Sequence, residues 1–185
     1  MGKIDDLANN YERHLSVPWQ QSVTGAQKIM LCIYDKEDER ILRAKLGDFE
    51  IRTRNTQHDW VQLDCTDIFS HWLAQDDYCD AYFESPDDIG MKIEGEFKDH
   101  VIDLIRKTVS QANNQTVVAL SGVASLYGFI HLSELIRAVE ADINGRLVIF
   151  FPGSKDGSNY RLLDARDGWN YLANGITLNG GRTNA

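Results

Sequence analysis

Cysteine is scarce in this chain of 185 residues, and long hydrophobic runs are absent. The three thiols, at Cys32, Cys65 and Cys79, are an odd number and too few for a disulfide framework at this length. This small number favours a reducing compartment. A membrane helix needs about 18 to 20 apolar residues in succession, and no such stretch occurs. The opening residues, MGKIDDLANNYERH, also lack the apolar core of a signal peptide. We therefore expect a cytoplasmic protein without a membrane anchor.

The length fits one domain, because about 100 to 200 residues is the usual size of this unit. Hydrophobic residues make up 43% of the chain, enough for a real core, so disorder is excluded as a description of the whole. We expect a single domain over residues 1–178. The glycine-containing residues 179–185 are expected to form a disordered tail.

Positive charge is also in short supply, with 19 Lys and Arg against 28 Asp and Glu and a net charge of −9. Between Asp64 and Asp103 there are twelve acidic residues and two lysines, so one region carries the acidity. Such a region repels phosphate backbones and favours a basic protein surface as partner, and we do not expect strong nucleic-acid binding by the chain alone. The alternative is a solvated acidic face that maintains solubility.

Hydrophobic periodicity predicts alternating strands and helices. A continuous apolar run indicates a strand at 29–34 in the interior of a sheet, and the residues 59–65, 116–120 and 146–151 also favour strands. Helical spacing indicates helices at 35–55, 66–73, 97–109 and 125–141, whereas 78–90 resembles an irregular surface insertion. The residues 159–163 and 170–176 favour a terminal hairpin or edge strands.

This order predicts an α/β fold: a three-layer sandwich with a mainly parallel central sheet of about five to six strands, flanked by helices. Ligands of such folds bind outside the carboxyl ends of the strands. The nucleotide-binding patterns GxxxxGK[ST] and GxGxxG are absent, as are the GxSxG elbow and the spacings of zinc ligands. We therefore predict no catalytic residue, no cofactor and no metal.

One turn keeps a weak anion-binding hypothesis open. Gly122 and Ser125 lie where the third strand is expected to feed a helix, and free N–H groups at a helix N-terminus attract anions. The turn has no lysine. Its glycine is more typical of a tight strand-to-helix turn with positive φ or close packing than of an anion site.

Two segments are candidates for a partner interface. One is the acidic stretch 76–88, and the other is the turn after residue 160, whose Arg and Trp are typical of interface hot spots. The turn could instead be self-contained, with its aspartates bonded to nearby backbone and arginines. The candidate residues are Asp76, Asp77, Asp87, Asp88, Arg161, Asp164, Arg166, Asp167 and Trp169.

Five segments together resemble the BrxB-type proteins of bacteriophage-exclusion (BREX) systems: YDKEDE, YFESPDD, VALSGVASLYGF, GRLVIFFPG and NYRLLDARDGWNYLA. The resemblance runs from about Lys3 to Ile176, and the last segment is the most specific. It implies a small prokaryotic phage-defence protein that associates with a PglZ-type member of the alkaline phosphatase superfamily and with other BREX components. It brings no catalytic residue.

The resulting hypothesis is a non-enzymatic adaptor or regulatory subunit. Two alternatives remain open at this stage. One is a nucleotide- or anion-binding regulator that uses the turn at Gly122. The other is a nucleic-acid-binding module that uses basic residues of the first crossover helix, namely Arg40, Arg43, Lys45, Arg52 and Arg54.

Overall fold

The computed structural model describes residues 2–20, 22–165, 168–171 and 173–178, so the expected tail at 179–185 lies outside the described residues. Its strands form one sheet in the order β2-β3-β4-β1-β7, with β5 paired to β4 and β6 paired to β5. The pairs along the main order are parallel, and the β4–β5 and β5–β6 pairs are antiparallel. The strands are β1 (Ile29–Tyr34), β2 (Asp59–Asp64), β3 (Thr116–Ser121), β4 (Arg146–Asp156), β5 (Asn159–Leu162), β6 (Trp169–Asn170) and β7 (Asn174–Ile176).

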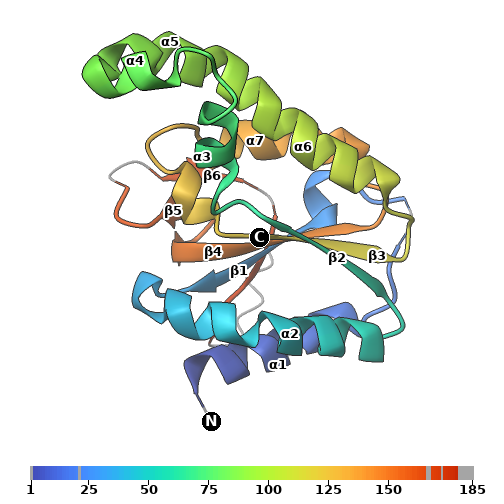
Figure 1. Ribbon diagram of the computed structural model, residues 1–185. Helices are drawn as coiled ribbons and strands as arrows, with labels where there is room; N and C mark the ends of the chain where they lie inside the picture. Colours follow the sequence, from blue (N-terminus) through green and yellow to red (C-terminus); the bar gives the residue numbers. More distant parts are fainter. Residues whose placement is uncertain (1, 21, 166–167, 172, 179–185) are drawn as a thin grey trace.

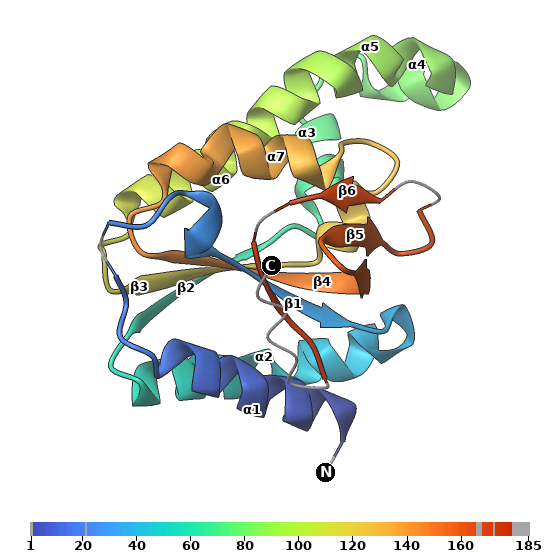
Figure 2. The same cartoon turned by 180° about the vertical axis from the view of Figure 1, so that it is seen from behind.

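Helices lie on both faces of this sheet. The helices α1 and α2 cover one face, and α6 and α7 cover the other (Figures 1 and 2). The α-helices are α1 (Lys3–Leu15), α2 (Glu39–Asn55), α3 (Ile68–Leu73), α4 (Cys79–Glu84), α5 (Gly90–Lys92), α6 (Lys98–Gln111) and α7 (Leu132–Val139). A π-helical turn, Ile93–Phe97, joins α5 to α6, and short 3-10 turns lie at Ala26–Lys28, Lys36–Asp38, Pro86–Ile89, Val123–Leu126 and Glu140–Asp142.

The core divides between the two faces because side chains alternate along a strand. In β1, Met30 and Cys32 join the cluster beneath α1 and α2, while Leu31 and Ile33 join the cluster beneath α6 and α7. All six residues of β1 are buried, as expected for an interior strand with neighbours on both sides. The α/β class and the mainly parallel sheet are thus confirmed.

Several predicted elements were wrong. The segment 78–90 is not irregular, because it contains α4 and a 3-10 turn that begins at Pro86. The helix expected from Ser125 begins only at Leu132, because a short 3-10 turn follows Gly122 first. The sheet has seven strands in the described part of the chain rather than about five to six, because the strand expected at 170–176 is divided into β6 and β7. The expected hairpin or edge strands are nevertheless present, since β6 pairs antiparallel with β5 and β7 forms the edge beside β1.

The structure also contains a helix that the sequence analysis did not predict, α1. Its buried residues recur at helical spacing, and they pack α1 against α2 and the sheet. The last strand, β7, leaves the β5–β6 pair and runs parallel to β1, with Leu31 opposite Gly175. Tyr160 helps to hold this path, because its hydroxyl donates a hydrogen bond of 3.0 Å to the Ala173 carbonyl.

Candidate functional site

The carboxyl ends of the parallel strands are the first place to look for chemistry, and there the polar groups are bonded to one another. The Tyr34 hydroxyl donates to Glu39 at 2.5 Å, and the Arg43 Nε donates to the same carboxylate at 2.8 Å. The Nη2 of Arg43 donates to the Thr66 hydroxyl at 2.8 Å. That hydroxyl in turn donates to the Asp64 carboxylate at 2.5 Å. Burial and the neighbouring Glu39 raise the pKa of Tyr34, so its hydroxyl stays protonated. The chain of bonds joins β1, α2 and β2.

Gly122 lies against this network. Its φ of +68° is the left-handed conformation that favours glycine, which confirms the predicted positive φ. A Cβ at this position would lie 2.4 Å from the Thr66 hydroxyl oxygen and 2.6 Å from an Asp64 carboxylate oxygen. The predicted close approach is therefore also present.

Anion binding at Gly122 and Ser125 stays a prediction, but the α-helix N-terminus on which it was based does not lie at these residues. Ser125 lies within a four-residue 3-10 turn, and the helix begins at Leu132. The nearest ionisable oxygen to Gly122 belongs to the Asp64 carboxylate, which repels an anion. The two residues are therefore best explained as a tight turn.

The strand β4 continues beyond its neighbours at this edge. Tyr34, the last residue of β1, is opposite Pro152, whereas β4 goes on to Asp156 and pairs with β5 from Gly153 onward. The connection after β1 runs through α2 on one face, and the connection after β3 runs through α7 on the other face. In an open α/β sheet this reversal creates the crevice where ligands bind. Here β4 extends past this position and continues as the β4–β5 pair.

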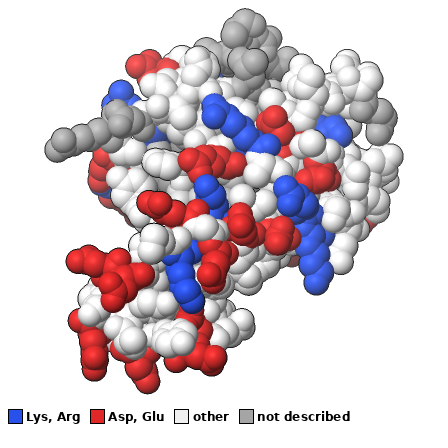
Figure 3. Space-filling model, turned by 90° about the horizontal axis from the view of Figure 1, so that it is seen from above, with Lys and Arg blue, Asp and Glu red and all other residues white. Residues whose placement is uncertain are grey.

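A helical projection stands at the same end of the molecule. We call residues 76–96 the arm; it comprises α4, the turn at Pro86–Ile89, α5 and most of the π-helical turn. The arm extends beyond the sheet at the start of α6 (Figures 1 and 2), and acidic side chains gather on the lobe that it forms (Figure 3). It contains eight Asp and Glu and a single lysine, Lys92. Phe97, fully buried at the arm's base, packs against Phe69 and Trp72.

The predicted acidic interface residues do not share one role. Asp77, Asp87 and Asp88 are exposed on the arm. Asp76 is not available in the same way, because its carboxylate is 2.6 Å from the Lys92 ammonium and also accepts a bond from the backbone N–H of Tyr78 at 2.8 Å. The hydrogen bond from Lys92 holds the pKa of Asp76 below its usual range. We therefore assign Asp76 to the arm's own structure.

The second predicted interface, the turn after β5, is divided in a similar way. Arg161 is exposed, and Asp164 forms an ion pair with Lys36 in the 3-10 turn that follows β1. The ring of Trp169 is half-buried, with its centroid 5.5 Å from that of Tyr160 and 5.3 Å from that of Tyr171. Trp169 thus packs against the core. The remaining candidates, Arg166 and Asp167, lie outside the described residues.

The arm and the turn lie at the same end of the molecule, beside the carboxyl ends of the strands (Figures 1 and 2). The sequence places them about 70 residues apart. Parallel strands bring them together, because every β–α connection leaves from the same edge.

The basic residues of α2 do not form an open basic surface. Arg43, Lys45, Arg52 and Arg54 each form ion pairs with carboxylates of this chain. Arg40 is exposed on the same helix. Because counterion release needs lysines and arginines that are free to meet phosphates, this pairing gives no support to the nucleic-acid hypothesis.

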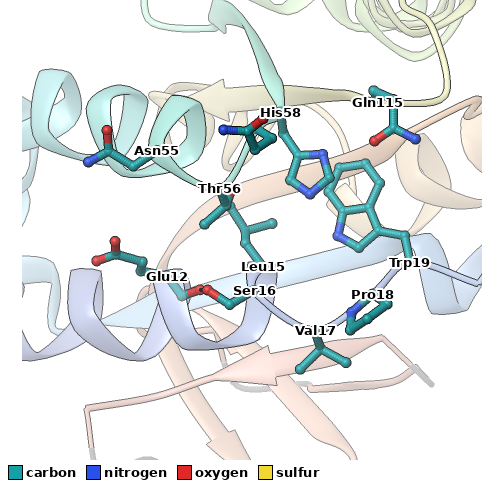
Figure 4. Close-up of a pocket in the computed structure, with 11 residues that line it drawn as sticks. Glu12, Leu15, Ser16, Val17, Pro18, Trp19, Asn55, Thr56, His58 and Gln115 are labelled. Carbon is teal, nitrogen blue, oxygen red and sulfur yellow. Dashed lines mark hydrogen bonds between the residues drawn. The ribbon is translucent and has the colours of Figure 1, made fainter.

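A pocket of about 460 Å³ lies at the opposite edge of the sheet, between the end of α1 and the segments that precede β2 and β3 (Figure 4). The rings of Trp19 and His58 stack there, with centroids 3.7 Å apart and planes 8° from parallel. The Arg146 guanidinium carbon lies 4.7 Å from the centre of the Trp19 ring. Trp19 therefore already has an aromatic and a cationic neighbour from this chain.

Two of the three thiols are poor nucleophiles and metal ligands. Cys32 and Cys65 are fully buried; burial raises the pKa of both, that of Cys65 to about 12. In the part of the chain that the structure describes, no group of three or more His, Cys, Asp or Glu could hold a metal ion. None of the described helices combines the length and the apolar character needed to cross a membrane.

The fold and the site together define an α/β protein whose sheet bears a projecting acidic arm at its carboxyl end. A family model described as BREX protein BrxB matches residues 62–174, which is more than half of the chain. The chain therefore belongs to the BrxB family and is a component of a BREX anti-phage system, as its resemblance implied. The matched region contains both the arm and the turn. No curated protein and no solved structure matches the chain.

Sequence reasoning overlooked the apolar side chains of the arm. Tyr78, Phe83 and Met91 are exposed there, among the acidic residues of the arm. Their exposure has no signal in a sequence, because an aromatic residue in a short segment is more often buried than exposed.

Proposed function

We propose that this BREX component is a non-catalytic adaptor or regulatory subunit whose direct partner is the PglZ-type protein of the system. The observation that carries the proposal is how the polar groups and strands are arranged at the carboxyl ends of the parallel strands. The polar groups at the ends of β1 and β2 bond to one another, and β4 extends past the position where an α/β enzyme would bind its substrate and continues as the β4–β5 pair. Family membership supports a partner within the BREX system.

The experiment is co-purification of the full chain with each BREX component in turn. We expect capture of the PglZ-type protein without any other component present. Failure to capture any component under native conditions would overturn the adaptor role, and capture of a different component would correct the partner.

Absence of catalysis is part of the proposal and has its own test. The purified chain is expected to hydrolyse neither ATP nor phosphodiesters. Asp35 and Ser125 are the informative positions, because they follow the ends of β1 and β3. Turnover that survives extensive purification and disappears in Asp35→Ala or Ser125→Ala would show that the protein is an enzyme.

The two alternative functions give different signals in simple binding assays. A bound nucleotide raises the melting temperature by mass action, since it binds only the folded state. Nucleic-acid binding would weaken steeply as salt is added. We expect neither signal from the isolated chain.

A further inference from the structure

The three most exposed large apolar side chains of the described residues all belong to the arm. They are Met91 at 87% exposed, Phe83 at 73% and Tyr78 at 67%, and they fall within fourteen residues of sequence. A single exposed hydrophobic residue is ordinary on a protein surface. Three exposed apolar side chains on one small projection indicate a binding surface.

The fold of the arm depends on other residues. Ile89, in the turn between α4 and α5, is buried, and Phe97 is buried at the base. Lys92 bonds to Asp76 and lies 5.8 Å from the centre of the Tyr82 ring, which ties α5 to α4. The exposed apolar side chains can therefore be truncated without loss of the contacts that hold the arm.

Acidic side chains surround these apolar ones. With eight acidic residues and Lys92, the arm has a formal charge of −7. The exposed acidic residues are Asp77, Asp80, Glu84, Asp87, Asp88, Glu94 and Glu96. This charge acts against a second copy of the same arm, an anionic membrane or a nucleic acid, because each would bring like charges together.

We propose that the arm docks into an apolar groove rimmed by Lys and Arg on a protein partner, with Phe83, Met91 and Tyr78 as anchors. The inference rests on the proposed function, because its partner is the BREX component that the adaptor binds. The anchors hold the complex together once formed, since buried aromatic and apolar side chains dominate interface energies. The acidic residues mainly speed the encounter.

The test measures association and dissociation of the full chain with the BREX component that it captures. Truncation in the double variant Phe83→Ala/Met91→Ala is expected to speed dissociation by about tenfold or more, because anchors act on the lifetime of a complex. Charge reversal in Asp87→Lys/Asp88→Lys is expected to slow association and to flatten its dependence on salt.

The matched control uses exposed apolar residues away from the arm. Ile41 and Ile51 on α2 are 49% and 59% exposed, so Ile41→Ala/Ile51→Ala removes exposed apolar surface elsewhere. This variant should bind as the wild type does. Circular dichroism and melting curves are expected to be unchanged for all three variants, which confines any effect to binding.

The outcomes separate the two proposals. If the wild-type chain binds no BREX component, the adaptor role fails, and the docking inference fails with it. If the wild type binds and both arm variants bind with unaltered kinetics, the docking inference alone is overturned, and the turn at Arg161 becomes the next surface to test.

Two other occupants would also overturn it. Light scattering of the wild type would reveal a dimer that the Phe83→Ala/Met91→Ala variant loses, if a second copy covered the arm. Vesicles containing phosphatidylserine would retain the wild type and release the same variant, if a membrane did so. We expect the wild type to be monomeric in light scattering, and we expect the vesicles not to retain it.

Discussion

Lys92 and Asp76, sixteen residues apart, are joined by an ion pair of 2.6 Å that closes the arm at its base. The side chain of Asp76 is only 10% exposed, whereas its neighbour Asp77 is exposed. Two adjacent aspartates thus have different roles. One holds the arm to its own base, and the other lies on the exposed surface of the arm.

Removal of that ion pair should loosen the arm. Asp76→Asn keeps the size of the side chain and an oxygen for the Tyr78 N–H, but it loses the charge that attracts Lys92. Amide hydrogen exchange over residues 76–96 is expected to become faster, while α1 and α2 keep their protection. The control Asp77→Asn should leave the exchange unchanged, and equal protection in both variants would contradict the assignment.

The same ion pair predicts a dependence on acid pH. Because Lys92 lowers the pKa of Asp76 in the folded state, the pair contributes fully above the ordinary aspartate pKa of about 3.9. Its contribution is lost as pH falls below that value and through the lowered pKa. The protection factors of the arm, taken relative to the intrinsic exchange rate at each pH, should therefore fall in this acid range for the wild type, and by less for Asp76→Asn.

His58 predicts a second pH dependence, nearer to neutrality. Desolvation at the back of the pocket lowers its pKa, and the charge of Arg146 acts in the same direction. The unfolded chain then binds a proton more readily, so stability is complete above about pH 6.5 and falls as pH drops toward the lowered pKa. Chemical denaturation at pH 7.5 and 5.5 should show this loss, and His58→Gln should reduce it. The control is His71→Gln, which changes an exposed side chain of α3 and should behave as the wild type.

Gly122→Val should reduce the free energy of unfolding by more than about 1 kcal/mol, because the residue combines positive φ with close contacts to Thr66 and Asp64. Gly128 separates these two causes. Its φ is +84°, but a Cβ there would meet nothing within 4 Å. Gly128→Val should therefore cost less than Gly122→Val in denaturant titrations, and an unchanged melting curve for Gly122→Val would remove the turn assignment.

Gly47→Ala should stabilise the protein. Gly47 lies within α2, where a Cβ would meet nothing within 4 Å. Alanine loses less backbone freedom on folding, so a gain of roughly 0.5 to 1 kcal/mol is expected in the same titrations. A loss of stability would contradict the open space around Gly47 on α2.

The turn after β5 predicts a contrast between Arg161 and Trp169. Trp169→Ala removes a ring that packs on Tyr160 and Tyr171, so it should reduce the free energy of unfolding by about 2 kcal/mol. Arg161→Ala changes an exposed side chain and should leave stability nearly unaltered. A faster dissociation of the partner from Arg161→Ala would therefore identify the turn as part of the interface, whereas Trp169→Ala needs its folding measured first.

Local pattern was sufficient for the buried parts of the fold. The apolar run of β1 and the helical spacing of Leu42 and Phe49 predict their elements to within a few residues, because burial imposes a period on the sequence. The same helical period is present in α1, at Ile4, Leu7, Ala8, Tyr11 and Leu15. The absence of P-loop and elbow motifs likewise needs no structure.

Other features depend on the tertiary structure. The sequence by itself determined a mainly parallel α/β protein of the BrxB family with its acidity in one region. Only the fold decided that Asp76 is bound to Lys92 while Asp77 is exposed, that β7 pairs with β1, and that the arm and the Arg161 turn share one end of the sheet. These are contacts between residues distant in sequence, and their energies depend on which surfaces meet rather than on any local period.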